Sequence, residues 1–310
     1  MKRFLIIFFR MALLLFLFAN IMAAFHAYKF THFEKDAILK AKNPEDLNFT
    51  QKLNALFFGV SLPRPETDIL PCDEFRNVMV ENEIACWEIK VPNEKGIALL
   101  FHGYGSNKAS VLGKAQEFNR MGYTAFLVDF RGSGGSAGSK TTIGFNEAKD
   151  VKACYDYIKS KNPKSILLCG TSMGAVAIMK CVSETNIQPN GIVLECPFGS
   201  MKQTVSNRFS AMGIPSFPLA DLLVFYGGII NGFWAFDHNP INYAKNIHVP
   251  TLLLCGGSDE RVTQQEIDDI FQNINAPKQK IIYPLAKHES YLNQYREAWR
   301  EDVICFIENL

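Results

Sequence analysis

Short, almost continuously apolar runs alternate with helical patterns along most of the chain, from about residue 75 onward. These runs have the length of strands and cover 96–101, 123–130, 165–170, 191–197, 250–257 and 278–284. Alternating strands and helices form βαβ units, in which the strands are parallel and helices cover both faces of the sheet. Strands buried on both faces are apolar along their whole length. The pattern therefore predicts an α/β fold with a mainly parallel sheet.

The remaining elements fit the same architecture. The runs at 75–80 and 83–91 predict a strand hairpin at one edge of the sheet. Helices are predicted between the strands, over 106–122, 143–161, 173–184 and 264–274, with a last helix over 290–309. In such sheets, ligands bind at the carboxyl ends of the parallel strands. Functional side chains are therefore expected directly after each strand.

Composition excludes several classes of function. The 32 basic and 31 acidic residues give a net charge of +1, so no nucleic-acid partner is expected. The eight cysteines form no CxxC pair and no zinc-site spacing, and the glycine-rich 131–138 lacks the Lys-Ser/Thr ending of a phosphate loop. We therefore expect no metal and no cofactor. Cys72 and Cys86 are the disulfide candidates if the domain is exported.

The first 28 residues contain an apolar run from Phe4 to Phe25, which follows the basic Lys2 and Arg3 and is interrupted only by Arg10 and Asn20. About 20 apolar residues suffice to span a membrane, so this segment predicts an uncleaved anchor. A cleaved signal peptide is the alternative, although no clear A-x-A cleavage site is present. The anchor is preferred, with the domain that follows it outside the cytoplasm. The alternative predicts a secreted or periplasmic protein. Residues 29–74 are interpreted as a connector, and 75–310 as the main domain.

Polar groups follow four of the predicted strands. His102-Gly103-Tyr104-Gly105 follows the first, and Gly170-Thr171-Ser172-Met173-Gly174 follows the third. Asp259 follows the strand at 250–257, and His288 follows the last strand. A serine hydroxyl becomes a good nucleophile when an imidazole accepts its proton, and a carboxylate orients that imidazole. Ser172, His288 and Asp259 are therefore the candidate catalytic residues.

With these motifs in the order Ser, Asp, His, the chain resembles the α/β-hydrolase superfamily of serine hydrolases over about 75–310. The segments 129–139 (DFRGSGGSAGS) and 195–198 (ECPF) resemble its esterase-like, lipase-like and serine-aminopeptidase-like members. The resemblance implies an eight-stranded sheet with helices on both faces. It also implies a nucleophile elbow at Ser172, a triad acid at Asp259 and a triad base at His288.

The backbone N–H groups of Met173 and Tyr104 are expected to form the oxyanion hole. Met173 begins a helix whose N-terminus points at the reacting centre, where negative charge develops. Tyr104 lies in the loop after the first strand, and the resemblance makes that loop the source of the second donor. His102, in the same loop, is interpreted as structural, and Asp129 as a residue that holds the loop after its strand.

The interval from about 199 to 249 interrupts the alternation and is rich in Phe, Leu, Ile and Trp. The resemblance implies a small helical cap there, and an apolar cap suits an acyl pocket or a membrane-facing mouth. The alternative is that these side chains pack on the sheet. We expect hydrolysis of a carboxylic ester or thioester with a hydrophobic, lipid-like substrate. The alternatives are a serine peptidase, amidase or acyltransferase on the same triad, and a hydrolase-fold protein that only binds.

Overall fold

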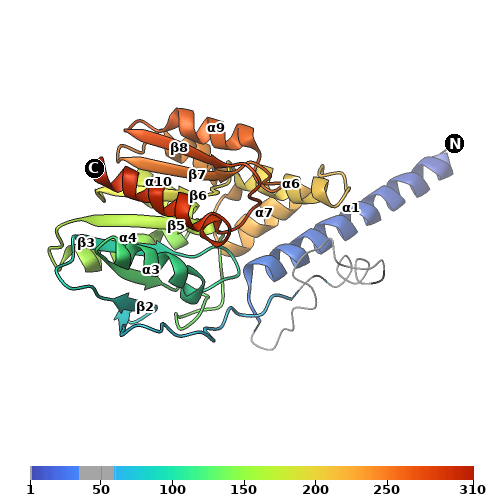
Figure 1. The fold of residues 1–310 in the computed structure, drawn as a ribbon. Coiled ribbons are helices and arrows are strands. Elements are labelled where there is room, and N and C mark those ends of the chain that lie inside the picture. The colour runs from blue at the N-terminus through green and yellow to red at the C-terminus, as the bar shows by residue number, and fades with distance from the viewer. Residues whose placement is uncertain (1, 35–49, 51–58, 60) are drawn as a thin grey trace. The chain divides into compact units, whose positions relative to one another are not determined.

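The computed structural model describes residues 2–34, 50, 59 and 61–310 (Figure 1). By their contacts, these residues fall into two units, Met1–Pro63 with Met201–His238, and Arg64–Ser200 with Asn239–Leu310. We refer to them as unit 1 and unit 2. Most of the predicted connector, 29–74, lies outside the described residues.

Unit 2 contains one sheet, whose eight described strands have the order β1-β2-β4-β3-β5-β6-β7-β8. Their bounds are β1 Arg76–Val80, β2 Ile84–Ile89, β3 Gly96–Phe101, β4 Tyr123–Val128, β5 Ile166–Thr171, β6 Gly191–Glu195, β7 Thr251–Gly256 and β8 Lys278–Tyr283. Strand β2 is antiparallel to β1 and β4, whereas β4, β3 and β5 to β8 are parallel. The predicted edge hairpin and the mainly parallel sheet are confirmed.

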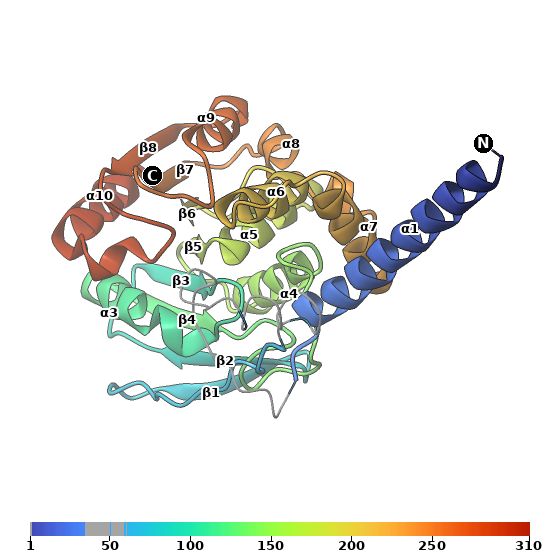
Figure 2. The same ribbon diagram turned by 90° about the vertical axis from the view of Figure 1, so that its right-hand side faces the viewer.

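Helices cover both faces of this sheet, as Figure 2 shows. The helices of unit 2 are α3 Leu112–Arg120, α4 Glu147–Lys159, α5 Met173–Glu184, α8 Pro240–Ala244, α9 Gln264–Asn273 and α10 Arg296–Glu308, with short 3₁₀ turns at Lys108–Val111 and Tyr291–Asn293. Helices α3 and α10 share one apolar core with the sheet, which includes the fully buried Phe118 and Trp299. Helices α4 and α5 lie on the opposite face. The predicted fold class is confirmed.

Helix α4 begins four residues later than the predicted start at residue 143. The backbone turns through positive φ at Ile143 (57°) and Gly144 (104°), which a helix cannot accommodate. The buried Glu147 carboxylate holds this turn by accepting from the hydroxyls of Thr141 and Thr142 and from the Gly144 N–H. A turn held by the Glu147 side chain therefore takes the place of the first predicted helical turn.

Unit 1 contains α1 Lys2–Thr31, α6 Met201–Ala211 and α7 Leu219–Asn231, with a 3₁₀ turn at Ala235–Asp237. Helices α6 and α7 lie within the interval 199–249, where a cap was predicted. Helix α8 lies in the same interval but belongs to unit 2. Helix α1 is the only described helix long and apolar enough to cross a membrane. By length and composition, it fits both an anchor and a signal sequence.

The predicted disulfide candidates are wrong, because all eight cysteines are free. Cys72 is exposed, whereas the Cys86 side chain is buried in the central part of β2. Its thiol faces the Ile84 carbonyl oxygen at 3.6 Å. Cys86 therefore packs as a small apolar side chain, which is how buried free cysteines usually behave.

Candidate active site

Ser172 occupies a sharp turn between β5 and α5, with φ of 52° and ψ of −111°. A non-glycine residue rarely adopts positive φ, and such strained positions concentrate at functional sites. Two backbone hydrogen bonds hold the turn: the Ser172 N–H donates to the Glu195 carbonyl (2.8 Å), and its carbonyl accepts from Val176 (3.0 Å). The Ser172 hydroxyl does not cap the helix that follows, so it is available to another partner.

Two glycines make this turn possible. A Cβ at Gly170 would lie 2.5 Å from the Gly174 carbonyl carbon, and one at Gly174 would lie 2.5 Å from the Phe101 carbonyl oxygen. Helix α5 therefore starts in direct backbone contact with the ends of β3 and β5. Neither position leaves room for a larger residue.

We expect Gly174→Ala to destabilise the folded protein by about 2–3 kcal/mol or more, because the added methyl group must push backbone away rather than a flexible side chain. Thermal unfolding in detergent, followed by circular dichroism, measures this. Gly227→Ala is the matched control, because a Cβ at that helical glycine meets nothing within 4 Å. Equal unfolding temperatures for the two variants would contradict the close contact.

The structure brings Ser172, His288 and Asp259 together in one line of hydrogen bonds. The Ser172 Oγ lies 2.9 Å from His288 Nε2, and His288 Nδ1 lies 2.8 Å from Asp259 Oδ2. The His288 side chain is 15% exposed and the Asp259 side chain 3%. The hydroxyl, imidazole and carboxylate that were predicted from three separate loops are therefore neighbours.

The Asp259 carboxylate is fixed from both sides. Its Oδ1 accepts from the backbone N–H groups of Arg261 (2.8 Å) and Val262 (3.0 Å), which leaves Oδ2 directed at His288. The preceding Ser258 anchors the loop through its N–H to Ala286 and its hydroxyl to Pro284. The neighbouring carboxylate of Glu260 is exposed and has no role in this line.

Of the two predicted oxyanion residues, Met173 directly follows Ser172, and Tyr104 lies in the loop after β3. Met173 is the first residue of α5, where backbone N–H groups have no partner within the helix. Tyr104 follows Gly103, and a Cβ at Gly103 would lie 3.9 Å from the Ser172 Cβ and 3.5 Å from the Thr171 carbonyl oxygen. The loop at the end of β3 therefore runs directly beside the turn that carries Ser172.

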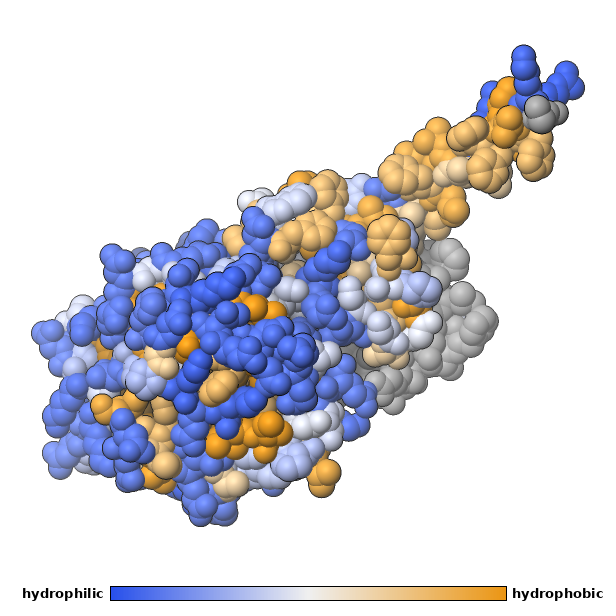
Figure 3. Space-filling model, turned by 90° about the horizontal axis from the view of Figure 1, so that it is seen from above, coloured by the Kyte–Doolittle hydropathy of each residue, from blue (hydrophilic) through white to orange (hydrophobic). Residues whose placement is uncertain are grey.

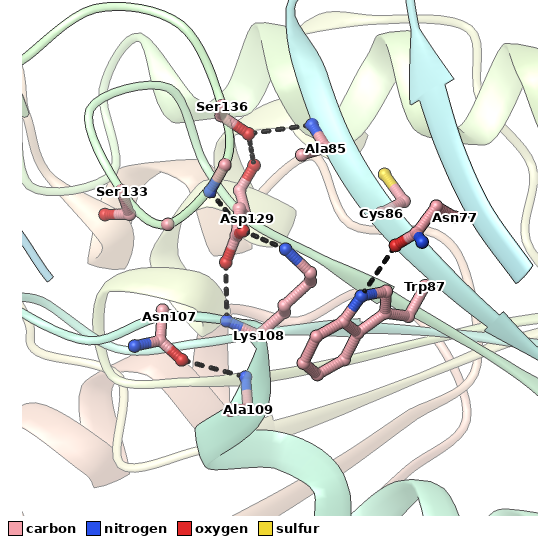
Figure 4. A network of polar contacts seen from close by, with 12 residues as sticks. Asn77, Ala85, Cys86, Trp87, Asn107, Lys108, Ala109, Asp129, Ser133 and Ser136 are labelled. Carbon is pink, nitrogen blue, oxygen red and sulfur yellow. Dashed lines mark hydrogen bonds and ion pairs between the residues drawn. The ribbon is translucent and has the colours of Figure 1, made fainter. Parts of the chain in front are cut away.

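His102 and Asp129 have the structural roles that the sequence predicts. His102 is fully buried, with Nε2 accepting from the Phe130 N–H (3.2 Å) and Nδ1 facing the Gly103 carbonyl (2.8 Å). Burial lowers its pKa, which keeps the ring neutral. Figure 4 shows the Asp129 carboxylate accepting from the Lys108 N–H (2.7 Å) and pairing with the Lys108 ammonium. The same carboxylate accepts from the Gly135 N–H (2.9 Å). Asp129 thus holds the glycine-rich loop against the 3₁₀ turn.

A buried ion pair that sequence reasoning missed lies beneath the Ser172 turn. Glu195 pairs with Lys114 of α3, and both side chains are almost fully buried. The same carboxylate accepts from the Thr171 hydroxyl (3.1 Å) and the Trp299 indole N–H (2.6 Å). Burial opposes the charge of Lys114, but the charge of Glu195 offsets it, and the pKa of Lys114 is raised. Glu195 therefore supports the end of β5.

We expect Lys114→Met to destabilise the protein by about 3–5 kcal/mol, because it leaves the Glu195 carboxylate buried without a countercharge. The double variant Lys114→Met/Glu195→Gln should recover most of this loss, since the amide is neutral and its oxygen still accepts from Trp299. The exposed pair of Lys152 with Asp156 is the control, and Lys152→Met should change stability by less than about 1 kcal/mol. Chemical unfolding in detergent measures all three; a double variant as unstable as Lys114→Met would contradict the electrostatic origin.

Within the described ranges, no group of three or more His, Cys, Asp or Glu side chains is arranged to hold a metal ion. The side chains brought together around Ser172 are a hydroxyl, an imidazole and a single carboxylate. This set is suited to moving a proton and holding it at a defined atom.

Comparisons with known proteins show which families and folds the chain is similar to. A family model described as serine aminopeptidase, S33, matches residues 92–223. An uncharacterized Bacillus subtilis protein, YqkD, is 24% identical over 68% of this chain and 71% of its own, and a carboxylesterase of the same organism is 26% identical over 68% and 92%. An esterase from Pyrococcus furiosus superimposes with a TM-score of 0.67 at 22% identity, over 80% of this chain and 97% of the esterase.

Proposed function

Because the chain is an α/β-hydrolase, we propose that it is a serine hydrolase that cleaves a carboxylic ester or thioester through an acyl-enzyme. The observation that carries the proposal is the continuous line from Ser172 through His288 to Asp259, with contacts of 2.9 and 2.8 Å. The strained backbone at Ser172 supports it further, since the turn presents the hydroxyl and gives it no capping partner.

In the proposed reaction, Ser172 Oγ attacks the carbonyl carbon while His288 Nε2 accepts the hydroxyl proton. The bond from the carbonyl carbon to the leaving oxygen or sulfur then breaks, and the imidazolium returns the proton to that leaving group. Water repeats the sequence on the acyl-enzyme, which releases the acid and restores Ser172. Asp259 keeps the Nδ1 proton on His288 and stabilises the imidazolium that forms in both halves.

The oxyanion of each tetrahedral intermediate is assigned to the N–H groups of Met173 and Tyr104. The position of Met173 at the start of the 12-residue α5 supports the first assignment, because the helix N-terminus carries partial positive charge. The contact of Gly103 with the Ser172 turn supports the second. Loss of one such donor typically costs about 3 kcal/mol of transition-state stabilisation.

The substrate class rests on the similar proteins. A carboxylesterase among the relatives and an esterase among the solved structures support ester cleavage. The serine aminopeptidase description of the family model keeps a peptidase as the second candidate, since the same triad attacks amides. A transfer of the acyl group to an alcohol or amine instead of water is the nearest variant of the same chemistry.

A substrate panel tests the class of reaction. We expect p-nitrophenyl esters to be hydrolysed with a kcat/KM that rises with acyl length, by up to about fourfold for each methylene that becomes buried. Aminoacyl p-nitroanilides should be cleaved far more slowly at equal concentration. Faster cleavage of the anilides would replace the esterase proposal with the peptidase.

We further propose that α1 is an uncleaved membrane anchor and that unit 2 is extracytoplasmic. The 30 residues of α1 exceed the roughly 20 that a span requires, and its residues up to Phe18 are exposed. Lys2 and Arg3 at one end favour an N-terminus on the cytoplasmic side. Resistance of the full chain to carbonate extraction from membranes is the expected result.

A further inference from the structure

Helix α1 packs against α7 inside unit 1, over the second half of its length. Residues up to Phe18 are exposed, whereas Ala23, Ala27 and Thr31 are buried at intervals of four residues. This spacing places the three small side chains on one face of α1. Small residues on one face let two helices approach closely. The first half of α1, whose apolar atoms are visible in Figure 3, contains one small residue, Ala12, and therefore has no such face.

Asn20, a polar residue that interrupts the apolar run of α1, has a specific partner on α7. The Asn20 side chain accepts a hydrogen bond from the Tyr226 hydroxyl (2.9 Å) and donates to the Phe16 carbonyl (2.8 Å). An asparagine in an apolar environment is costly unless its groups are bonded. Asn20 therefore joins α1 to α7, and α1 is a structural part of unit 1.

A second face of α7 is apolar and exposed. Phe225 and Ile229 lie one turn apart on it, and Phe225 makes an edge-on contact with Trp234 at 6.0 Å between ring centroids. Ile229 is 57% exposed and Trp234 50%. We call Phe225, Ile229 and Trp234, which follows shortly after the end of α7, the α7 apolar face. The one acidic side chain of α7, Asp221, pairs with Lys202 of α6 at 2.7 Å.

Because α7 packs against α1, the depth at which α1 enters a membrane indicates what covers the α7 apolar face. Helix α1 is about 45 Å long, whereas the hydrocarbon core of a bilayer is about 30 Å thick. With the exposed first half inside the bilayer, the Asn20–Tyr226 contact lies near the boundary between hydrocarbon and headgroups. Tryptophan is enriched at this boundary, and helices that lie on a membrane bury their apolar faces about 5–10 Å deep.

We propose that the α7 apolar face docks into the lipid bilayer beside a retained α1. The proposal rests on the anchor assigned to α1 above, and it adds a second membrane contact made by a segment about 200 residues further along the chain. Signal cleavage would remove α1, and with it both Asn20, the partner of Tyr226, and the helix that packs against α7. The anchor and α7 therefore act as one membrane-bound module.

The three tryptophans of the chain allow a direct test with the full-length protein. Trp87 and Trp299 are buried in unit 2, whereas Trp234 belongs to the α7 apolar face. The protein is reconstituted into phosphatidylcholine–phosphatidylglycerol vesicles, with and without brominated acyl chains that quench tryptophan on contact. We expect brominated lipid to quench a component that Trp234→Phe removes, and aqueous iodide to leave that component unchanged.

A matched control uses an exposed position on the sheet. Ile282→Trp, placed in the Trp234→Phe background, puts a tryptophan at a site that is 45% exposed in unit 2. This tryptophan should be quenched by iodide and not by brominated lipid. Quenching of Trp234 by iodide alone would overturn the proposal, and so would protection from both quenchers, because a protein partner would then cover the face.

The anchor itself is checked in the same samples. Mass spectrometry of the purified chain must find the α1 peptide, and carbonate must leave the protein in the membrane. Absence of α1 would refute both the anchor and the docking of α7. A retained α1 with Trp234 in water would refute the docking alone.

Discussion

Substitution of Ser172 by alanine is expected to lower kcat for p-nitrophenyl ester hydrolysis by roughly 10⁶-fold. The variant lacks the oxygen that forms the acyl-enzyme, while His288 and Asp259 keep their own contact. The oxyanion donors and substrate contacts remain, so a rate about 10³–10⁴-fold above that in water can persist. Steady-state kinetics with a circular dichroism spectrum of each protein measures the effect.

The control for this substitution is Ser258→Ala, which removes another serine hydroxyl from a loop at a strand end. That hydroxyl donates to the Pro284 carbonyl at 3.0 Å and is not in line with His288. We expect its kcat to stay within about tenfold of the parent, since only one hydrogen bond of about 1 kcal/mol is lost. Equal losses in the two variants would argue that folding, and not chemistry, is affected.

Replacement of Asp259 by asparagine should lower kcat by about 10⁴-fold without changing the fold. An asparagine oxygen at the Oδ1 position still accepts from Arg261 and Val262, so its amide N–H₂ faces His288 Nδ1. That amide donates where the carboxylate accepts, which favours the wrong tautomer of the imidazole. His288 then presents a proton, and not a lone pair, to Ser172.

Glu260→Gln provides the neighbouring control for the triad acid. Glu260 is exposed and adjacent in sequence, so its charge is screened by water. We expect kcat to change by less than about twofold. A large loss in Glu260→Gln together with a small loss in Asp259→Asn would reassign the acid.

The sequence predicts the sheet well because the residues of each strand are sufficient to indicate that strand. Leu99, Leu168 and Leu253 lie in strands that are buried on both faces, and such strands are apolar without interruption. Ser172, Asp259 and His288 were found for a related reason: each follows a strand end, and the topology gathers those ends at one edge of the sheet. Local patterns and a simple topological rule were sufficient for both.

Long-range polar contacts could not be predicted in the same way. Lys114 lies in a helix with an ordinary polar composition, and only its partner Glu195, 81 residues further on, makes its burial possible. The Asn20–Tyr226 contact spans 206 residues. Each of these side chains is unremarkable in its own segment, so a single sequence contains no local signal that pairs them.

The predicted pairing of Cys72 with Cys86 was wrong for a similar reason. Proximity along the chain suggested a bond, but β2 directs Cys86 into the protein interior while Cys72 stays at the surface. All six residues of β2 are buried, so Cys86 lies in the interior whichever face of the strand it occupies. Sequence spacing alone does not show that burial.

The central claim is that Ser172 forms the covalent acyl-enzyme, and labelling with a fluorophosphonate tests it most directly. This probe bonds to a serine oxygen that an adjacent base activates, and trypsin releases Ser172 in the peptide 165–180, which also contains Ser165. Tandem mass spectrometry should find one adduct per folded chain, on Ser172, and none in Ser172→Ala or in denatured protein. An adduct on a different serine, or no adduct on folded protein, would contradict the account.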